Sequence, residues 1–235
     1  MLLVVFAVTW FVWPRLPIIT AFAAKGMCSS VFLAGKIPER VEAEDLSFFP
    51  ISAAKCELVY EEKSVTATVL GLAKRKAVFR EGLGAVLVLD KPEEELRART
   101  FQIPDPGYRQ DTIPWPLGDV LPADRPEGVD YARLESTLKD AIDESGSEPV
   151  KKTLGLAVVY DNQLIAEQYM EGYDAWTRFH GWSMTKSITG AMTGALVGEG
   201  RLDIKSPVNI PEWQSDERRN ITVENILHMS SGLDW

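Results

Sequence analysis

The chain has 235 residues, of which 46% are hydrophobic, and a formal net charge of −9 at pH 7. This length is sufficient for one well-buried core, or for one core with a small additional module. The negative charge argues against a nucleic-acid-binding protein, because contacts to phosphate groups require a basic surface.

Residues 1–25 are predicted to be a hydrophobic signal or membrane anchor, because residues 1–13 carry no charge and apolar sequence resumes up to Ala24. A clean membrane span needs about 20 apolar residues. Arg15 and two prolines interrupt this one, and no basic segment precedes it as in an ordinary signal peptide. A buried helix is the alternative. We favour an exported protein that is anchored to the membrane on its extracytoplasmic (periplasmic) side.

Residues 26–103 are predicted to form a small α+β module that carries no chemistry. Residues 39–46 favour a helix, and residues 55–71 favour two strands joined by a turn at 61–64. Two further strands are predicted near 77–79 and 85–90. The whole module is interpreted as a packing or positioning domain.

The two cysteines of the chain, Cys28 and Cys56, do not have the spacing of zinc ligands. Export would permit a disulfide between them. Two small buried thiols are an equally good interpretation. The sequence leaves both possibilities open.

Residues 104–128 are rich in proline, which fixes φ and removes a backbone donor, so neither a helix nor a central strand is expected. We interpret them as a linker that Trp115 attaches to a neighbouring module. Residues 130–146 then predict an amphipathic helix. Residues 153–160 and 163–169 flank a turn and predict a β-hairpin, whose first strand is apolar enough to be covered on both faces.

The pattern Ser-x-x-Lys occurs three times, at Ser52/Lys55, Ser136/Lys139 and Ser183/Lys186. The first pair precedes a strand, so no helix holds its two side chains on one face. The second pair lies among acidic residues on the polar face of the helix at 130–146. A lysine in water stays protonated there and cannot accept a proton from the serine.

The third pair differs because it opens a helix that is predicted to be buried. This helix has no charge between Lys186 and Glu199, and glycines recur along one face. Each glycine costs about 1 kcal/mol relative to alanine in a helix interior, so another backbone is expected to approach closely. The glycines are Gly190, Gly194 and Gly198.

Position and spacing make Ser183 a candidate nucleophile and Lys186 its candidate base. A residue in the first turn lies where the helix dipole stabilises an anion, and the residue three positions later is its neighbour. Desolvation disfavours the ammonium, so a poorly solvated lysine is neutral and can activate a serine hydroxyl. The backbone N–H of Ser183 can serve as one oxyanion donor.

Four segments together resemble a known group of enzymes, the serine hydrolases related to class C β-lactamases and penicillin-binding proteins. The resemblance covers about residues 105–235 and is greatest to the branch of 6-aminohexanoate-dimer hydrolases and esterases. The segments are WPLGD (115–119), GWSMTKS (181–187), GEGRLDIKSPV (198–208) and ITVENILHMSSGLDW (221–235).

The resemblance implies an α+β fold for residues 129–235, an incomplete β-lactamase/transpeptidase-like domain in which helices pack on an antiparallel sheet. It also implies hydrolysis of amide or ester bonds through an acyl-enzyme on Ser183, with Lys186 as the base. Small linear amides or esters are the expected substrates. No cofactor, no metal and no nucleic acid are expected; the membrane is the other expected partner, through the N-terminal segment.

The family completes its site with a tyrosine in a Y-x-N or Y-x-S motif and with a K/H-T-G-like strand. Both follow the SGL segment in the family, and the sequence ends at Trp235 before either. We therefore expect an N-terminal portion of the domain that is inactive by itself. The alternative is a non-catalytic, membrane-tethered fragment or pseudoenzyme. His180 and His228 have no evident acid partner, so a Ser-His-Asp site is not expected.

Overall fold

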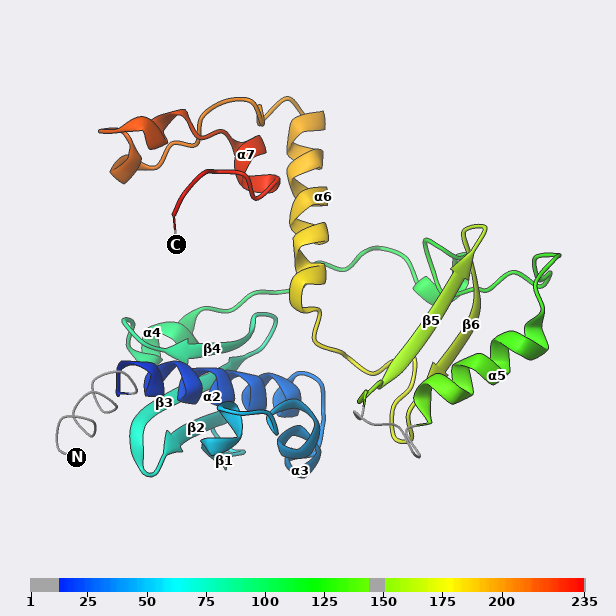
Figure 1. Ribbon diagram of the computed structural model, residues 1–235, viewed down its shortest axis with the longest axis horizontal. Coiled ribbons are helices and arrows are strands. Elements are labelled where there is room, and N and C mark those ends of the chain that lie inside the picture. Colours follow the sequence, from blue (N-terminus) through cyan, green and yellow to red (C-terminus); the bar gives the residue numbers. More distant parts are fainter. Residues whose placement is uncertain (1–12, 144–150, 235) are drawn as a thin grey trace. The chain divides into compact units, whose positions relative to one another are not determined.

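The computed structural model describes residues 13–143 and 151–234, which belong to two compact units, Met1–Arg178 and Phe179–Trp235 (Figure 1). The described helices are α2 (Leu16–Phe32), α3 (Pro38–Arg40), α4 (Glu93–Ala98), α5 (Tyr131–Ile142), α6 (Thr185–Gly198) and α7 (Val223–Leu227). The described strands are β1 (Lys55–Val59), β2 (Ser64–Val69), β3 (Leu72–Arg80), β4 (Gly84–Val88), β5 (Gly155–Tyr160) and β6 (Gln163–Tyr169). The mixed α+β composition with antiparallel sheets agrees with the prediction.

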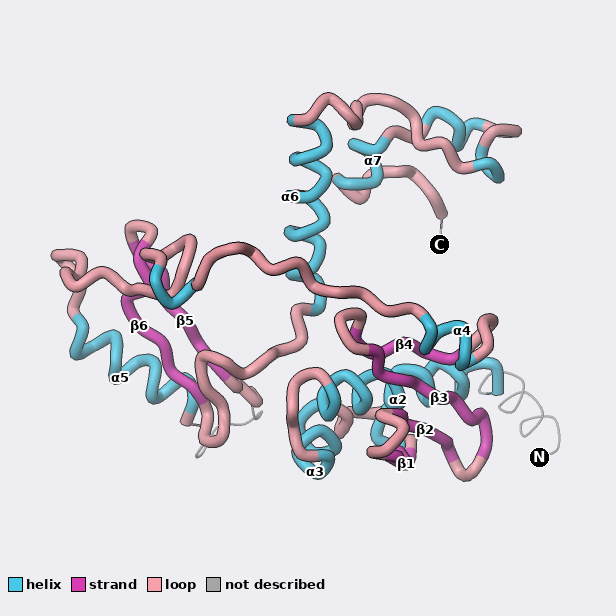
Figure 2. The backbone as a smooth tube through the Cα atoms, turned by 180° about the vertical axis from the view of Figure 1, so that it is seen from behind, coloured by secondary structure: helices cyan, strands magenta, loops and turns pink. Residues whose placement is uncertain are grey.

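The first unit begins with a four-stranded antiparallel sheet on which α2 packs (Figures 1 and 2). The strands follow one another in sequence order, so short turns are sufficient to connect them. Alternation of β-branched and small residues along β2 provides an apolar face against the helix. The core includes Met27, Cys28, Val41, Val65, Ala67 and Ala77, each of them fully buried. All the strands predicted for this module are thereby confirmed.

Helix α2 contains residues 16–25, which lie within the segment predicted to be an anchor. Ala23 and Ala24 are buried in the core, and the buried Thr20 hydroxyl donates a hydrogen bond of 2.6 Å to the carbonyl of Ala73. For residues 16–25 the structure therefore shows the buried helix that was the alternative interpretation. No helix in the described part of the chain is long and apolar enough to cross a membrane. Residues 1–12 lie outside the described residues.

Both cysteines of this module are free thiols. Cys28 is buried in the core and Cys56 is half-buried beside it. Burial raises the pKa of each thiol to about 11. Of the two possibilities that the sequence left open, the structure has the two separate thiols.

The proline-rich segment 104–128 is irregular apart from a short turn of 3-10 helix at Gln110–Thr112. The indole Nε1 of Trp115 donates a hydrogen bond of 2.9 Å to the carbonyl of Asn162 in the turn of the β5–β6 hairpin. Trp115 thus attaches the linker to the hairpin, as the sequence indicates.

The β5–β6 hairpin and α5 form a small layer of their own (Figure 1). Asp161 and Asn162 both have positive φ, 49° and 58°, as a two-residue hairpin turn requires. The prediction that β5 is covered on both faces is wrong for the described chain, because Val159 and Tyr160 are each more than half exposed. Helix α5 packs against β6 and begins at its predicted N-cap, Asp130, whose carboxylate accepts a hydrogen bond from the N–H of Arg133. Residues 144–146 of the predicted helix lie outside the described residues.

The second unit consists of α6, several short turns and α7. Helix α7 has a capping box, in which Thr222 and Asn225 satisfy each other's backbone N–H groups. The backbone N–H of Val208 donates to the carbonyl of Ile221, which holds the loop after α6 beside the start of α7.

Candidate active site

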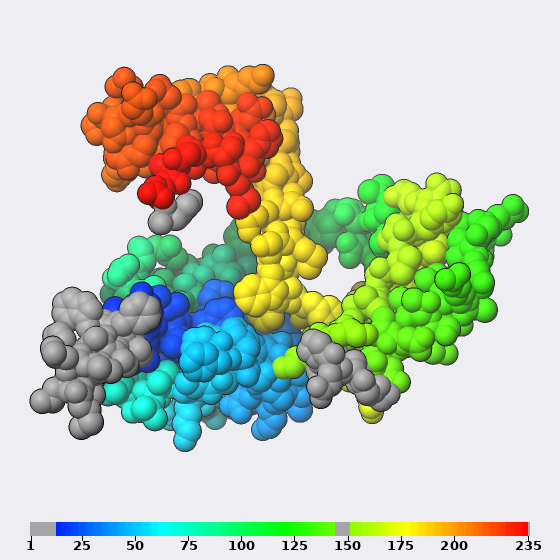
Figure 3. All heavy atoms as spheres, viewed as in Figure 1, coloured from blue at the N-terminus to red at the C-terminus, as the bar shows by residue number. Residues whose placement is uncertain are grey.

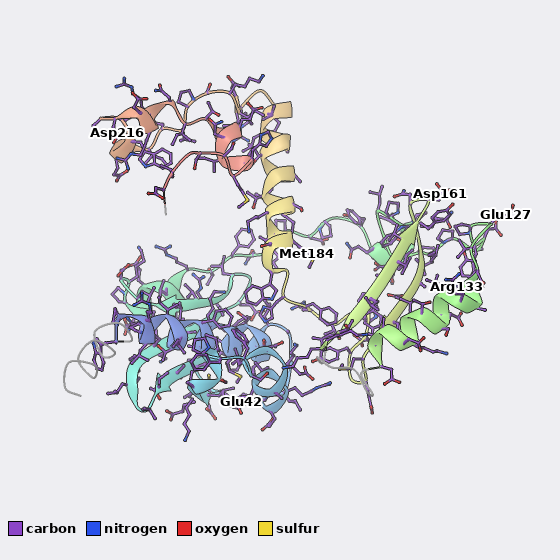
Figure 4. The ribbon with its side chains drawn as sticks, viewed as in Figure 1. Glu42, Glu127, Arg133, Asp161, Met184 and Asp216 are labelled. Carbon is purple, nitrogen blue, oxygen red and sulfur yellow. The ribbon has the colours of Figure 1, made fainter. Side chains whose placement is uncertain are left out.

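The structure brings the two predicted site residues into direct contact. Ser183 lies in the 3-10 turn Trp182–Met184, which leads without a break into α6, and Lys186 is the second residue of α6. The Lys186 Nζ donates a hydrogen bond of 3.0 Å to the Ser183 Oγ. Figure 4 labels Met184, the neighbour of Ser183, at this end of α6. Geometry therefore supports the pairing, whereas the catalytic roles stay a prediction.

The residue before the candidate nucleophile has an unusual backbone conformation. Trp182 has φ of 41°, in the left-handed region that bulky residues rarely adopt. Backbone strain of this kind costs on the order of 1–3 kcal/mol and is concentrated at functional sites. The bend turns the chain into α6 directly at Ser183. Sequence reasoning missed this feature, because tryptophan is not a residue that indicates positive φ.

The Ser183 hydroxyl is not used to cap the helix. In the described chain, neither the 3-10 turn nor α6 has a side-chain cap at its N-terminus. The hydroxyl therefore lies beside the positive end of the helix dipole with Lys186 as its partner. Negative charge that develops at this position is favoured.

The prediction that α6 is buried is wrong for the described residues. None of its residues is buried, and Ile188 and Met192 are 62% and 66% exposed. A Cβ built on Gly190, Gly194 or Gly198 meets nothing within 4 Å. The space-filling view shows the atoms of α6, in yellow, open to the viewer along the helix (Figure 3). Helix α6 is exposed because the described residues of its unit place no second helix or strand against the face that carries these glycines.

Solvent exposure does not distinguish the Ser-x-x-Lys pair at the start of α6 from the pair on α5. Ser183 and Lys186 are exposed, as are Ser136 and Lys139 on α5. Among the described residues, Lys186 is therefore exposed to solvent, whereas the sequence predicted a poorly solvated position for it. What separates the pairs is the direct Oγ–Nζ hydrogen bond, which the described contacts contain at 183/186 and not at 136/139.

The other polar candidates do not complete the site. The ring of His180 lies 6.1 Å from that of Trp182, and His228 is the C-cap residue that follows α7. The hydroxyls of Tyr169 and Tyr173 bind Glu167 and Glu44, all within the first unit. Across residues 13–143 and 151–234, no cluster of His, Cys, Asp or Glu has the composition of a metal site.

Comparison of the sequence with known protein families places Ser183 and Lys186 inside a family match. The model of the family described as Beta-lactamase matches residues 138–235, which include β5, β6 and the whole second unit. Over these residues the predicted resemblance to the β-lactamase-like serine hydrolase family is confirmed.

A more specific likeness is to the 6-aminohexanoate-dimer hydrolase of Paenarthrobacter ureafaciens. It is 30% identical over 105 residues, or 44% of this chain. The matched segment spans only 23% of the length of that relative. No solved structure matches the chain.

Proposed function

We propose that this chain carries the nucleophile and the base of a serine hydrolase that cleaves amide or ester bonds. The observation that supports the proposal is the 3.0 Å contact between Ser183 and Lys186 at the start of α6, inside the region that matches the Beta-lactamase family. Ser183 is the nucleophile and Lys186 is the general base.

The chemistry uses the short distance of this contact but requires the hydrogen bond to reverse, so that the Ser183 hydroxyl donates to the Lys186 Nζ. A neutral Lys186 Nζ takes the proton from the Ser183 Oγ while Oγ attacks the carbonyl carbon of the substrate. The oxyanion of the tetrahedral intermediate is stabilised by the Ser183 N–H and the α6 dipole. The intermediate expels the amine or alcohol, which receives the proton from Lys186. Water then hydrolyses the acyl-enzyme by the same steps and releases the carboxylic acid.

Covalent labelling with a fluorophosphonate probe tests this assignment. In a longer chain that completes the site, we expect phosphonylation of wild type, none of Ser183→Ala, and at least tenfold slower labelling of Lys186→Ala. Ser136→Ala and Lys139→Ala are matched controls from the exposed pair on α5 and should be labelled at the wild-type rate. Equal labelling of Ser183→Ala and wild type would reject Ser183 as the nucleophile.

A second candidate is that these 235 residues by themselves are a non-catalytic fragment or pseudoenzyme, the alternative that the exposure of Ser183 and Lys186 favours. Under this proposal the chain hydrolyses p-nitrophenyl esters no faster than Ser183→Ala does. If the coding sequence continues in frame after codon 235, labelling and turnover of the longer chain test whether further residues complete the site.

For the substrate class we propose small linear amides or esters, since the relative from Paenarthrobacter ureafaciens is named for the dimer of 6-aminohexanoate. An extracytoplasmic, membrane-anchored location is a further proposal, supported by the charge-free sequence of residues 1–13 alone. Fractionation of cells that express the chain with and without residues 2–12 tests it. Equal recovery of both forms in the soluble fraction would oppose an anchor.

A further inference from the structure

The first unit has a cavity of about 270 Å³ beside the β5–β6 hairpin, and neither Ser183 nor Lys186 belongs to its lining. Three aromatic side chains line it: Trp115 from the linker, Tyr169 from β6 and Trp176 from the loop after β6. Asp119 and Glu167 are the charged groups in the same lining. The cavity therefore combines aromatic side chains with carboxylates.

Hydrogen bonds hold the side chains of Trp115 and Tyr169 and the backbone of Trp176. The indole of Trp115 donates to the carbonyl of Asn162 at 2.9 Å, and the Tyr169 hydroxyl donates to Glu167 at 2.5 Å. The backbone N–H of Trp176 donates to the Asp174 carboxylate at 3.0 Å, which fixes the loop. The Trp176 side chain is 78% exposed, so one wall of the cavity is an aromatic group open to solvent.

The cavity is negatively charged. No lysine or arginine is present among the described residues of its lining. The hydrogen bond that the Tyr169 hydroxyl donates to Glu167, burial, and the charges of Glu167 and Asp174 raise the pKa of Tyr169 to about 12, which supports a negative potential at the aromatic groups. A neighbouring cavity of about 350 Å³ differs, because Arg125 and Lys139 line it together with Glu167.

We propose that the 270 Å³ cavity binds a small organic cation, of the alkylammonium class. Ammonium groups are attracted to the faces of tryptophan and tyrosine and to carboxylates, and these are the groups that surround this space. Leu121 and Leu164 also line the cavity and provide apolar contact for the alkyl chain. The volume lies just below the range for drug-sized ligands, so it suits a ligand of a few carbon atoms. This proposal does not depend on the hydrolase assignment.

The test is a titration of the full chain with hexylammonium chloride, compared with the neutral isostere 1-hexanol at constant ionic strength. The readout is the NMR signals of the Trp115 and Trp176 indole N–H groups, assigned with Trp→Phe variants. We expect saturable shifts of both signals, with a dissociation constant on the order of 1 mM. Hexanol should bind at least tenfold more weakly. Equal affinity for both probes, or no saturable shift with hexylammonium, overturns the proposal.

Variants separate the aromatic contribution from the charge. Trp176→Ala should weaken binding by about two- to fivefold, the effect of one cation–π contact at an exposed site. Glu167→Gln should weaken binding of hexylammonium but not of hexanol. Tyr160→Ala and Asp161→Asn are matched controls on the same hairpin outside the cavity, and Asp161 is labelled at the hairpin turn in Figure 4. If these controls weaken binding as much as Trp176→Ala and Glu167→Gln do, the binding reflects general surface charge, and the proposed site is rejected.

Discussion

Thr20→Val tests whether the apolar sequence after Arg15 belongs to the folded module. Thr20 is fully buried in α2, and its hydroxyl donates to the Ala73 carbonyl at 2.6 Å. Valine has nearly the same shape but cannot donate, so the Ala73 carbonyl loses its bond to the helix. Leaving a buried acceptor without its partner costs about 1–3 kcal/mol. The Ala73 carbonyl is partly buried and its bond to Thr20 is short, so we expect about 2 kcal/mol.

Two controls isolate the hydrogen bond. Thr20→Ser keeps the hydroxyl and removes one methyl group, which should cost about 0.8 kcal/mol. Thr137→Val removes a hydroxyl that bonds to the Arg133 carbonyl on the exposed face of α5, and it should change stability by less than about 0.5 kcal/mol.

The assay is native-state hydrogen exchange at the amides of β2, which reports the opening free energy of this module separately from the rest of the chain. A segment that serves only as a hydrophobic anchor would tolerate or prefer valine. A Thr20→Val effect smaller than that of Thr20→Ser would refute the packing argument.

The remaining predictions concern the thiols and α6. Because the pKa of Cys28 and Cys56 is about 11, both thiols should react with iodoacetamide about 100-fold more slowly than free cysteine at pH 8. The reaction rate should then rise about tenfold with each pH unit up to pH 11. Equal rates in native and urea-unfolded protein would contradict this prediction. These raised pKa values stabilise the fold below the usual thiol value of 9.0, so stability should decline between about pH 9 and pH 11, as urea titrations at each pH would show. Gly194→Ala should stabilise α6 by about 1 kcal/mol, because no group lies within 4 Å of the added Cβ; a loss of amide protection in α6 would instead reveal another backbone against this face.

Much of the local structure was predictable because it depends on neighbouring residues. Alternating side chains identified the strands of the first sheet, and the pair Asp161–Asn162 identified the hairpin turn through its tolerance of positive φ. The Ser183–Lys186 contact is equally local, since helical geometry brings residues three positions apart together.

The family resemblance was also present in the sequence, and three of its four segments lie within the Beta-lactamase family match over residues 138–235. Solvation was not predictable in the same way. A helix as apolar as α6 suggests burial, but burial requires a second surface, and the described residues of its own unit place none against its glycine face.

Other features were decided by tertiary structure alone. The apolar residues 16–25 suit a membrane or a core equally well, and only the distant strand β3 provides the acceptor at Ala73 that binds Thr20. Likewise, Trp115 and Trp176 are 61 positions apart in the sequence and share one cavity because the linker folds onto the hairpin. The sequence by itself determined the elements and the pairing of Ser183 with Lys186, because these follow from short-range backbone geometry. The faces that pack, and the side chains that gather in one cavity, depend on contacts between distant segments that no local pattern encodes.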